Sequence, residues 1–254
     1  MGRTPPESVL KALRKEVGFG CPVPGCGSPY LEWHHFDPPW RIKEHHNPEG
    51  MIALCSHHHK AADAGAYTNE QLKEFKISAA ASMSDRRGKF EWMRRDILAV
   101  VGGSFFYETP VIFNFKGTDL IWFERDEDGY MLLNVRMIGK NKKKKALIRN
   151  NFWMSSGDEV DLICPPSGKS LRAMYGDKES FSVTFDEIIT TDAFNKKYPN
   201  VPTYAQHFNF PLTVMEATYH MGAGAPFFEN YINAGSLEMH SCLAIRCRTG
   251  VRID

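Results

Sequence analysis

Residues 21–59 read CPVPGCGSPYLEWHHFDPPWRIKEHHNPEGMIALCSHHH. This stretch holds seven of the chain's ten histidines and three of its six cysteines. Cysteine thiolate and neutral imidazole are preferred ligands of zinc, and two short ligand pairs separated by a loop can close a tetrahedral site. The concentration of these residue types predicts that a metal organises the N-terminal part of the chain.

Four of these residues make a complete ligand set. Cys21 and Cys26 form one pair, and Cys55 and His58 form a second pair with the spacing Cys-x2-His at a turn that enters a helix. Three thiolates and one imidazole leave no position for water, which suits a structural zinc ion. Because this segment is short and polar, we expect zinc binding to supply much of its folding free energy.

The remaining histidines lie in a series that resembles the HNH (ββα-metal) nucleases, in their zinc-containing bacterial form. The series runs CPVPGC at 21–26, EWHHF at 32–36, NPEGMIALCSHHH at 47–59 and ADAGAYTNEQL at 62–72. It covers residues 21–76, less than a quarter of the chain, and the ordered elements are far more specific than one Cys-x4-Cys pair. The resemblance implies a metal-dependent endonuclease that hydrolyses phosphodiester bonds, above all in double-stranded DNA.

The resemblance also implies roles for individual histidines. His35 is similar to the general base, which takes a proton from the attacking water. His34 and His59 match the two positions that hold a divalent cation, Mg²⁺ or Mn²⁺, which neutralises the scissile phosphate and stabilises the leaving 3′ oxygen. His57 is expected to face outward.

Further polar side chains surround these histidines. Arg41, Lys43 and Lys60 are candidate nucleic-acid contacts, with ordinary solvated cations as the alternative. His45 and His46 lie in the loop between the two halves of the motif. We interpret them either as solvated loop residues or as contacts to substrate phosphate or to an auxiliary metal.

The chain departs from the family pattern at one position. Gly50, five residues before Cys55, stands where the family usually has the Asn that gives the motif its middle letter. In the family that Asn braces the loop and orients the strand that carries the base. Asn47, three residues earlier, is the candidate substitute if the loop folds back.

Composition adds weaker information. The chain of 254 residues is 43% hydrophobic, with a net charge of +1 and a pI near 7.7. Residues 1–95 carry 14 Lys and Arg against 11 Asp and Glu, whereas residues 96–254 carry 17 against 19. A weakly basic N-terminal part permits nucleic-acid contact without demonstrating it.

The sequence contains no apolar leader and no run of about 18 apolar residues, so we expect a cytoplasmic protein that does not contact a membrane. In a reducing compartment, clustered cysteines are metal ligands rather than disulfides. Cys164, Cys242 and Cys247 are scattered, and we expect them to be buried free thiols.

Local patterns predict the N-terminal elements. Thr4 is expected to cap a helix that has proline in its first turn and continues up to Gly18. Strands are expected at 30–34 and 50–55, and a helix at 56–63. Thr68 and Gln71 have the spacing of a capping box at the start of another helix.

The local sequence pattern becomes β-rich after residue 95. We expect an HNH domain with structural zinc at 1–77, a linker or helix at 78–95 and a mainly β domain, sandwich or barrel-like, at 96–254, which makes an α+β protein. A lysine run at 140–145 is interpreted as a solvated hairpin tip or a phosphate-contacting loop. Short β-rich runs are expected at 97–101, 111–115, 120–123, 130–135, 146–148, 181–185 and 242–246.

The β-rich domain is expected to supply recognition, oligomerisation or regulation. Candidate partners are DNA, a second copy of the chain, and an activating ligand or protein for this domain. Free-standing HNH proteins with an added domain resemble restriction or anti-phage effectors. The alternative function is a zinc-stabilised nucleic-acid or protein-binding module without catalysis.

Overall fold

The computed structural model describes residues 2–79, 86–138, 144–155, 157–220, 227–228, 231–234 and 237–254. It divides into two compact units. Unit 1 comprises residues 1–88 and 154–174, and unit 2 comprises residues 89–153 and 175–254. Residues 154–174, which lie inside the predicted C-terminal domain, therefore belong to the N-terminal unit.

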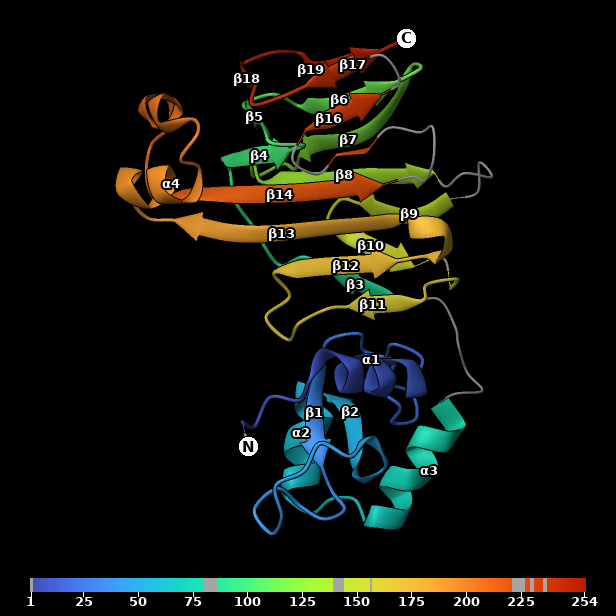
Figure 1. The fold of residues 1–254 in the computed structure, drawn as a ribbon. Coiled ribbons are helices and arrows are strands. Elements are labelled where there is room, and N and C mark those ends of the chain that lie inside the picture. Colours follow the sequence, from blue (N-terminus) through green and yellow to red (C-terminus); the bar gives the residue numbers. More distant parts are fainter. Residues whose placement is uncertain are drawn as a thin grey trace. The chain divides into compact units, whose positions relative to one another are not determined.

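Unit 1 contains a small ββα arrangement with added helices (Figure 1), and it also includes one hairpin from residues 161–174. Its elements in chain order are α1 (Glu7–Glu16), β1 (Leu31–His35), the 3-10 turn η1 (Pro48–Gly50), β2 (Met51–Cys55), α2 (Ser56–Asp63), α3 (Asn69–Ala79), β11 (Asp161–Ile163) and β12 (Ser170–Met174). β1 pairs antiparallel with β2, and β11 pairs antiparallel with β12.

The β1–β2 hairpin places the histidine motif on a buried framework. Every residue of β2 is buried, because α1 and α2 both pack against this strand. His34 of β1 lies opposite Ile52, and His35 lies opposite Met51. The hairpin thus fixes the backbone of both histidines, since register cannot slip without exposing the buried face.

Two helix starts differ in how well the sequence predicted them. Thr4 is not the cap of α1, because the helix begins at Glu7 and Pro6 occupies the N-cap position with an extended ψ of 150°. Thr4 and Pro5 each precede a proline, and the residue before a proline is driven toward extended conformations, so the helix does not begin before Pro6. The capping box of α3 is confirmed, because Thr68 N–H donates to Gln71 Oε1 and Gln71 N–H donates to Thr68 Oγ1.

A buried ion pair joins β11 to helix α1 within unit 1. Arg14 of α1 donates from Nε to Asp161 Oδ1 at 2.9 Å and from Nη2 to Asp161 Oδ2 at 2.8 Å. Arg14 is 3% exposed and Asp161 is 2% exposed. Glu7 also accepts from Arg14 Nη2 at 2.6 Å, but its side chain is 67% exposed.

Replacing Asp161 by alanine is expected to lower the free energy of unfolding of unit 1 by about 3–5 kcal/mol, because the buried Arg14 charge loses its buried carboxylate partner and keeps the exposed Glu7. Glu7→Ala is the matched control. It removes the other carboxylate from the same guanidinium, and an exposed pair contributes no more than about 1 kcal/mol. Urea denaturation of the full-length variants measures both. Equal losses in the two variants would contradict a buried origin of the effect.

Unit 2 is built from two large sheets of mixed strand direction, and neither closes into a barrel among the described strands. The first sheet contains, in spatial order, β19 (Thr249–Ile253), β6 (Val111–Phe115), β7 (Thr118–Arg125), β8 (Met131–Ile138) and β9 (Lys144–Arg149). The second contains β13 (Ser180–Ile188), β14 (Leu212–His220), β15 (Phe227–Phe228), β16 (Ile232–Ala234) and β17 (Leu237–Met239). β4 (Ile97–Val101) pairs parallel with β14, and β5 (Ser104–Tyr107) joins β4 to β18 (Leu243–Ile245). β3 (Arg87–Lys89) and β10 (Phe152–Ser155) lie where the chain passes between the units.

The long antiparallel pair β13 and β14, visible in Figure 1, forms the framework of unit 2. Phe181, Val183 and Phe185 alternate inward from β13, as a strand with one buried face requires. Helix α4 (Thr191–Lys197) buries Phe194 in a core cluster with β4 and β14. Thr190 caps this helix by accepting from Ala193 N–H.

The predicted α+β class is confirmed, and each of the seven predicted β-rich runs overlaps a strand of the structure. The lysine run falls at 140–143 outside the described residues, so both interpretations of it stay predictions. None of the helices in the described ranges is long and apolar enough to cross a membrane.

Candidate functional site

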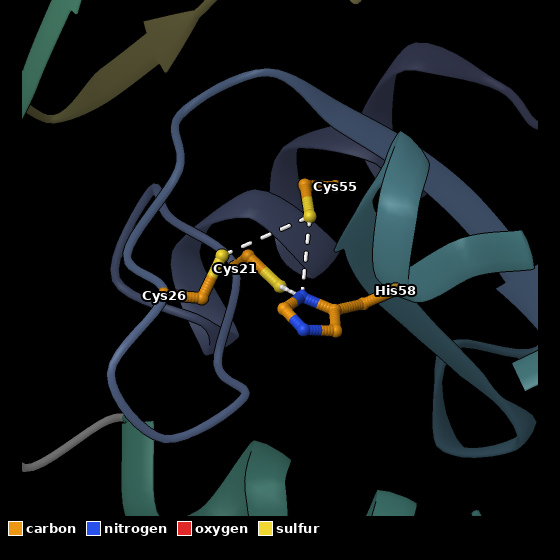
Figure 2. Close-up of side chains that lie close together, drawn as sticks. All are labelled: Cys21, Cys26, Cys55 and His58. Atoms are coloured by element: carbon orange, nitrogen blue, oxygen red, sulfur yellow. Dashed lines mark hydrogen bonds between the residues drawn. The ribbon is translucent and has the colours of Figure 1, made fainter. Parts of the chain in front are cut away.

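The four predicted zinc ligands converge in unit 1 (Figure 2). Cys55 Sγ lies 3.2 Å from His58 Nδ1, Cys21 Sγ lies 3.3 Å from the same nitrogen, and Cys26 Sγ lies 3.7 Å from Cys55 Sγ. Zinc with Zn–S near 2.3 Å and Zn–N near 2.0 Å has tetrahedral edges of about 3.8 Å between sulfurs and about 3.5 Å between sulfur and nitrogen. The observed spacing therefore fits a tetrahedral Cys3His site.

The electrostatics of this cluster also favour a cation. Burial, with a smaller contribution from the neighbouring Cys55 and Cys26, raises the pKa of Cys21 to about 12. Burial also lowers the pKa of His58, so its imidazole is neutral. Three thiols and a neutral ring around one point become a stable charged set only when a cation replaces the thiol protons.

A second group of candidate ligands lies at the end of β1 and on α2. Ligand atoms of His34, His59 and Asp63 all lie within 4.8 Å of one another. His34 Nδ1 is 3.2 Å from Asp63 Oδ1, and His59 Nδ1 is 3.4 Å from Asp63 Oδ2. The structure thus brings His34 and His59 together as predicted and adds Asp63, which the sequence reasoning missed.

The ring of His59 is oriented by the neighbouring strand. His59 Nε2 lies 3.3 Å from the carbonyl oxygen of Trp33, and a carbonyl can only accept a hydrogen bond. The proton is therefore on Nε2, which leaves Nδ1 as the ligand atom facing Asp63. Burial, and to a smaller extent His59, lowers the pKa of His34, which keeps its ring neutral for metal binding.

His35 is held in the complementary way. His35 Nε2 donates to the carbonyl oxygen of His45 at 3.0 Å, so the lone pair of the neutral ring is on Nδ1. Burial, and to a smaller extent His45, lowers the pKa of His35 to about 4. The ring is therefore unprotonated near neutral pH and able to accept a proton.

A cavity of about 400 Å³ connects the second ligand group to His35. Its wall includes Arg3, Trp40 and Arg41 as well as His34, His35, His59 and Asp63. Arg41 is the predicted nucleic-acid contact that reaches this cavity, whereas Lys43 and Lys60 are exposed and do not line it. His57 is exposed, as predicted.

A second cavity of about 340 Å³ shares His35, His59, Trp33 and Arg3 with the first. Pro166, from the loop between β11 and β12, is part of its wall. The hairpin that Asp161 fixes to α1 therefore contributes to the surroundings of the candidate base. Neither Arg3 nor Pro166 was predicted, because they lie far from the motif in the sequence.

The three scattered cysteines are free thiols, but only Cys164 is buried. The expectation that Cys242 and Cys247 are buried is wrong, because both are exposed. They lie on either side of the short edge strand β18, whose residues are only partly buried.

Comparison with family models, curated proteins and solved structures finds no match to this chain.

Proposed function

We propose that the protein is a metal-dependent endonuclease of the HNH type that hydrolyses phosphodiester bonds in double-stranded DNA. The observation that carries this proposal is the position of His35 beside the group His34, His59 and Asp63, with all four side chains on one cavity. A general base next to a divalent-cation site is the minimum that one-metal phosphodiester hydrolysis requires.

His35 acts as the general base. Its Nδ1 accepts the proton of the attacking water, while its Nε2–H stays bound to the carbonyl of His45, which stabilises the imidazolium that forms. His34, His59 and Asp63 hold the divalent cation, Mg²⁺ or Mn²⁺. When bound there, the cation neutralises the scissile phosphate and stabilises the leaving 3′ oxygen.

Two arginines fit the substrate side of this site. Arg3 lines both cavities, and Arg41 lines the larger one. Guanidinium groups bind phosphate oxygens in a planar, bidentate geometry. Because the two cavities meet at His35 and His59, we place the scissile phosphate there, with the flanking nucleotides of the cut strand in the cavities on either side.

The Cys3His cluster binds a structural zinc ion, since a closed set of four protein ligands leaves no position for water or substrate. Residues 154–174 support a regulatory role for the C-terminal part, because they belong to unit 1 and reach the second cavity through Pro166. Control by an activating ligand, a protein or a second copy of the chain, and a role as a restriction or anti-phage effector, follow from the family resemblance.

A zinc-stabilised binding module without catalysis is the second candidate. The observation in its favour is Gly50, which stands in place of the family's bracing Asn. Such a module would bind nucleic acid or protein through the same cavities but would leave DNA intact.

The wild-type protein is expected to cut plasmid DNA with Mg²⁺ or Mn²⁺ and to lose this activity in EDTA. Asp63→Asn should raise the Mn²⁺ concentration needed for half-maximal cleavage, because a neutral amide is a weaker ligand than a carboxylate. His57→Ala, which changes an exposed histidine on the same helix, should match the wild type. DNA that is bound but uncut at every metal concentration would favour the binding module.

A further inference from the structure

His45 is bound at both nitrogens of its ring. Its Nδ1 lies 3.1 Å from Asn47 N–H, and its Nε2 lies 2.8 Å from the carbonyl oxygen of Pro38. An amide N–H can only donate and a carbonyl can only accept, so both bonds require the same neutral tautomer, with the proton on Nε2. The ring therefore ties together the two ends of the loop between β1 and η1.

The backbone of His45 contacts the candidate base directly. Its carbonyl oxygen accepts from His35 Nε2 at 3.0 Å, and the two rings meet edge to face with centroids 5.1 Å apart. One residue thus closes the loop with its side chain and sets the tautomer of His35 with its main chain. Any movement of the loop away from Pro38 would move the acceptor that holds His35.

Gly50 cannot take the bracing role that the family gives to Asn. A Cβ atom at Gly50 would lie 1.9 Å from the carbonyl oxygen of Asp37, so no side chain fits. The N–H groups of Phe36 and Asp37 both donate to the Gly50 carbonyl, which holds the chain in this close approach. The side-chain oxygen of Asn47 accepts from Glu49 N–H as the cap of η1.

We propose that His45 is the positioning residue of this site and takes the role that Asn has in the family. This inference rests on the proposed nuclease function and deepens it. The ring of His45 holds the loop to Pro38, and the loop presents the His45 carbonyl that keeps the lone pair of His35 on Nδ1. His45 acts through His35 and does not contact the reacting atoms.

His45→Ala is expected to lower kcat for plasmid cleavage by at least about tenfold, with KM and zinc content unchanged, because a small displacement of the base affects chemistry more than binding. His45→Gln keeps an N–H donor for the Pro38 carbonyl and should recover part of the loss. His57→Ala, which changes an exposed histidine of the same unit, is the control and should keep wild-type kcat.

A double-mutant cycle separates positioning from general stability. If His45 acts through His35, the double variant His35→Ala/His45→Ala should cut no more slowly than His35→Ala alone. Independent losses that multiply would overturn the proposal, and so would a His45→Ala protein that cuts at the wild-type rate.

Nitrogen NMR of the histidine rings tests the same role without any activity. Long-range ¹H–¹⁵N spectra of the full-length protein should show His35 as the Nε2–H tautomer, and His45→Ala should give a mixture of tautomers. An unchanged His35 tautomer in His45→Ala would overturn the proposal. A wild-type protein that shows the expected tautomers but cuts no DNA would instead refute the nuclease function and leave the bracing role of His45 in place.

Discussion

Replacing Cys55 by serine is expected to abolish zinc binding and to unfold the N-terminal unit. Cys55 lies within hydrogen-bonding distance of both Cys26 and His58, so its loss opens the centre of the Cys3His cluster. Binding of structural zinc contributes on the order of 10 kcal/mol to the folding of small zinc domains. That amount is comparable with the entire stability of a typical domain, roughly 5–15 kcal/mol.

Elemental analysis and circular dichroism measure the two parts of this expectation. The wild-type protein should hold about one tightly bound zinc ion per chain, and Cys55→Ser should hold none and lose its cooperative thermal transition for unit 1. Cys242→Ser is the matched control, because Cys242 is an exposed free thiol outside the cluster. A zinc-free wild-type protein that is fully folded would show that the four side chains pack without metal.

Local spacing in the sequence predicted the two ligand pairs of the Cys3His cluster, whereas the pairing of His34 with His59 came from the family resemblance. Cys55 and His58 lie three residues apart at the junction of β2 and α2, where helix geometry brings them to one point. The same reasoning could have found Asp63. It lies four residues after His59 on the same face of α2, and that spacing was available in the sequence.

Other parts of the site could not be predicted, because they depend on contacts between residues far apart in the chain. Arg14 and Asp161 are 147 residues apart, and neither has a local pattern that marks it as buried. Only the tertiary fold places the β11–β12 hairpin in unit 1 and Pro166 in the wall of a cavity that His35 also lines. Arg3 reaches the cavities in the same non-local way.

Some strands of the β-rich half were predicted from the sequence and others were missed, depending on how regular their apolar pattern is. Runs rich in Val, Ile and Phe were found either because they are apolar throughout, as in β4, or because apolar residues alternate along them, as in β13. β14, the central partner of β13, was missed, since Glu216 and two threonines interrupt its apolar residues. The pairing of β4 with β14 joins residues more than a hundred positions apart, and periodicity carries no information on such partners.

Replacing His35 by alanine is expected to reduce DNA cleavage by at least about 10²-fold, the usual contribution of a general base. Zinc content should not change, because His35 is outside the Cys3His cluster. The thermal midpoint should change little, since the hydrogen bond that His35 donates to the His45 carbonyl contributes only about 1 kcal/mol. Single-turnover cleavage of a supercoiled plasmid measures the rate, with His57→Ala as the control.

Manganese dependence distinguishes the base from the metal ligands. His34→Ala removes one of three candidate ligands, so it should lower the affinity for the cation, and excess Mn²⁺ should restore part of its activity. His35→Ala should not recover at any Mn²⁺ concentration, because added metal cannot replace the nitrogen that accepts the proton from water. The reverse result, rescue of His35→Ala but not of His34→Ala, would exchange the roles of the two neighbouring histidines. If both variants cut at the wild-type rate, neither residue takes part in the chemistry and the activity resides elsewhere in the chain.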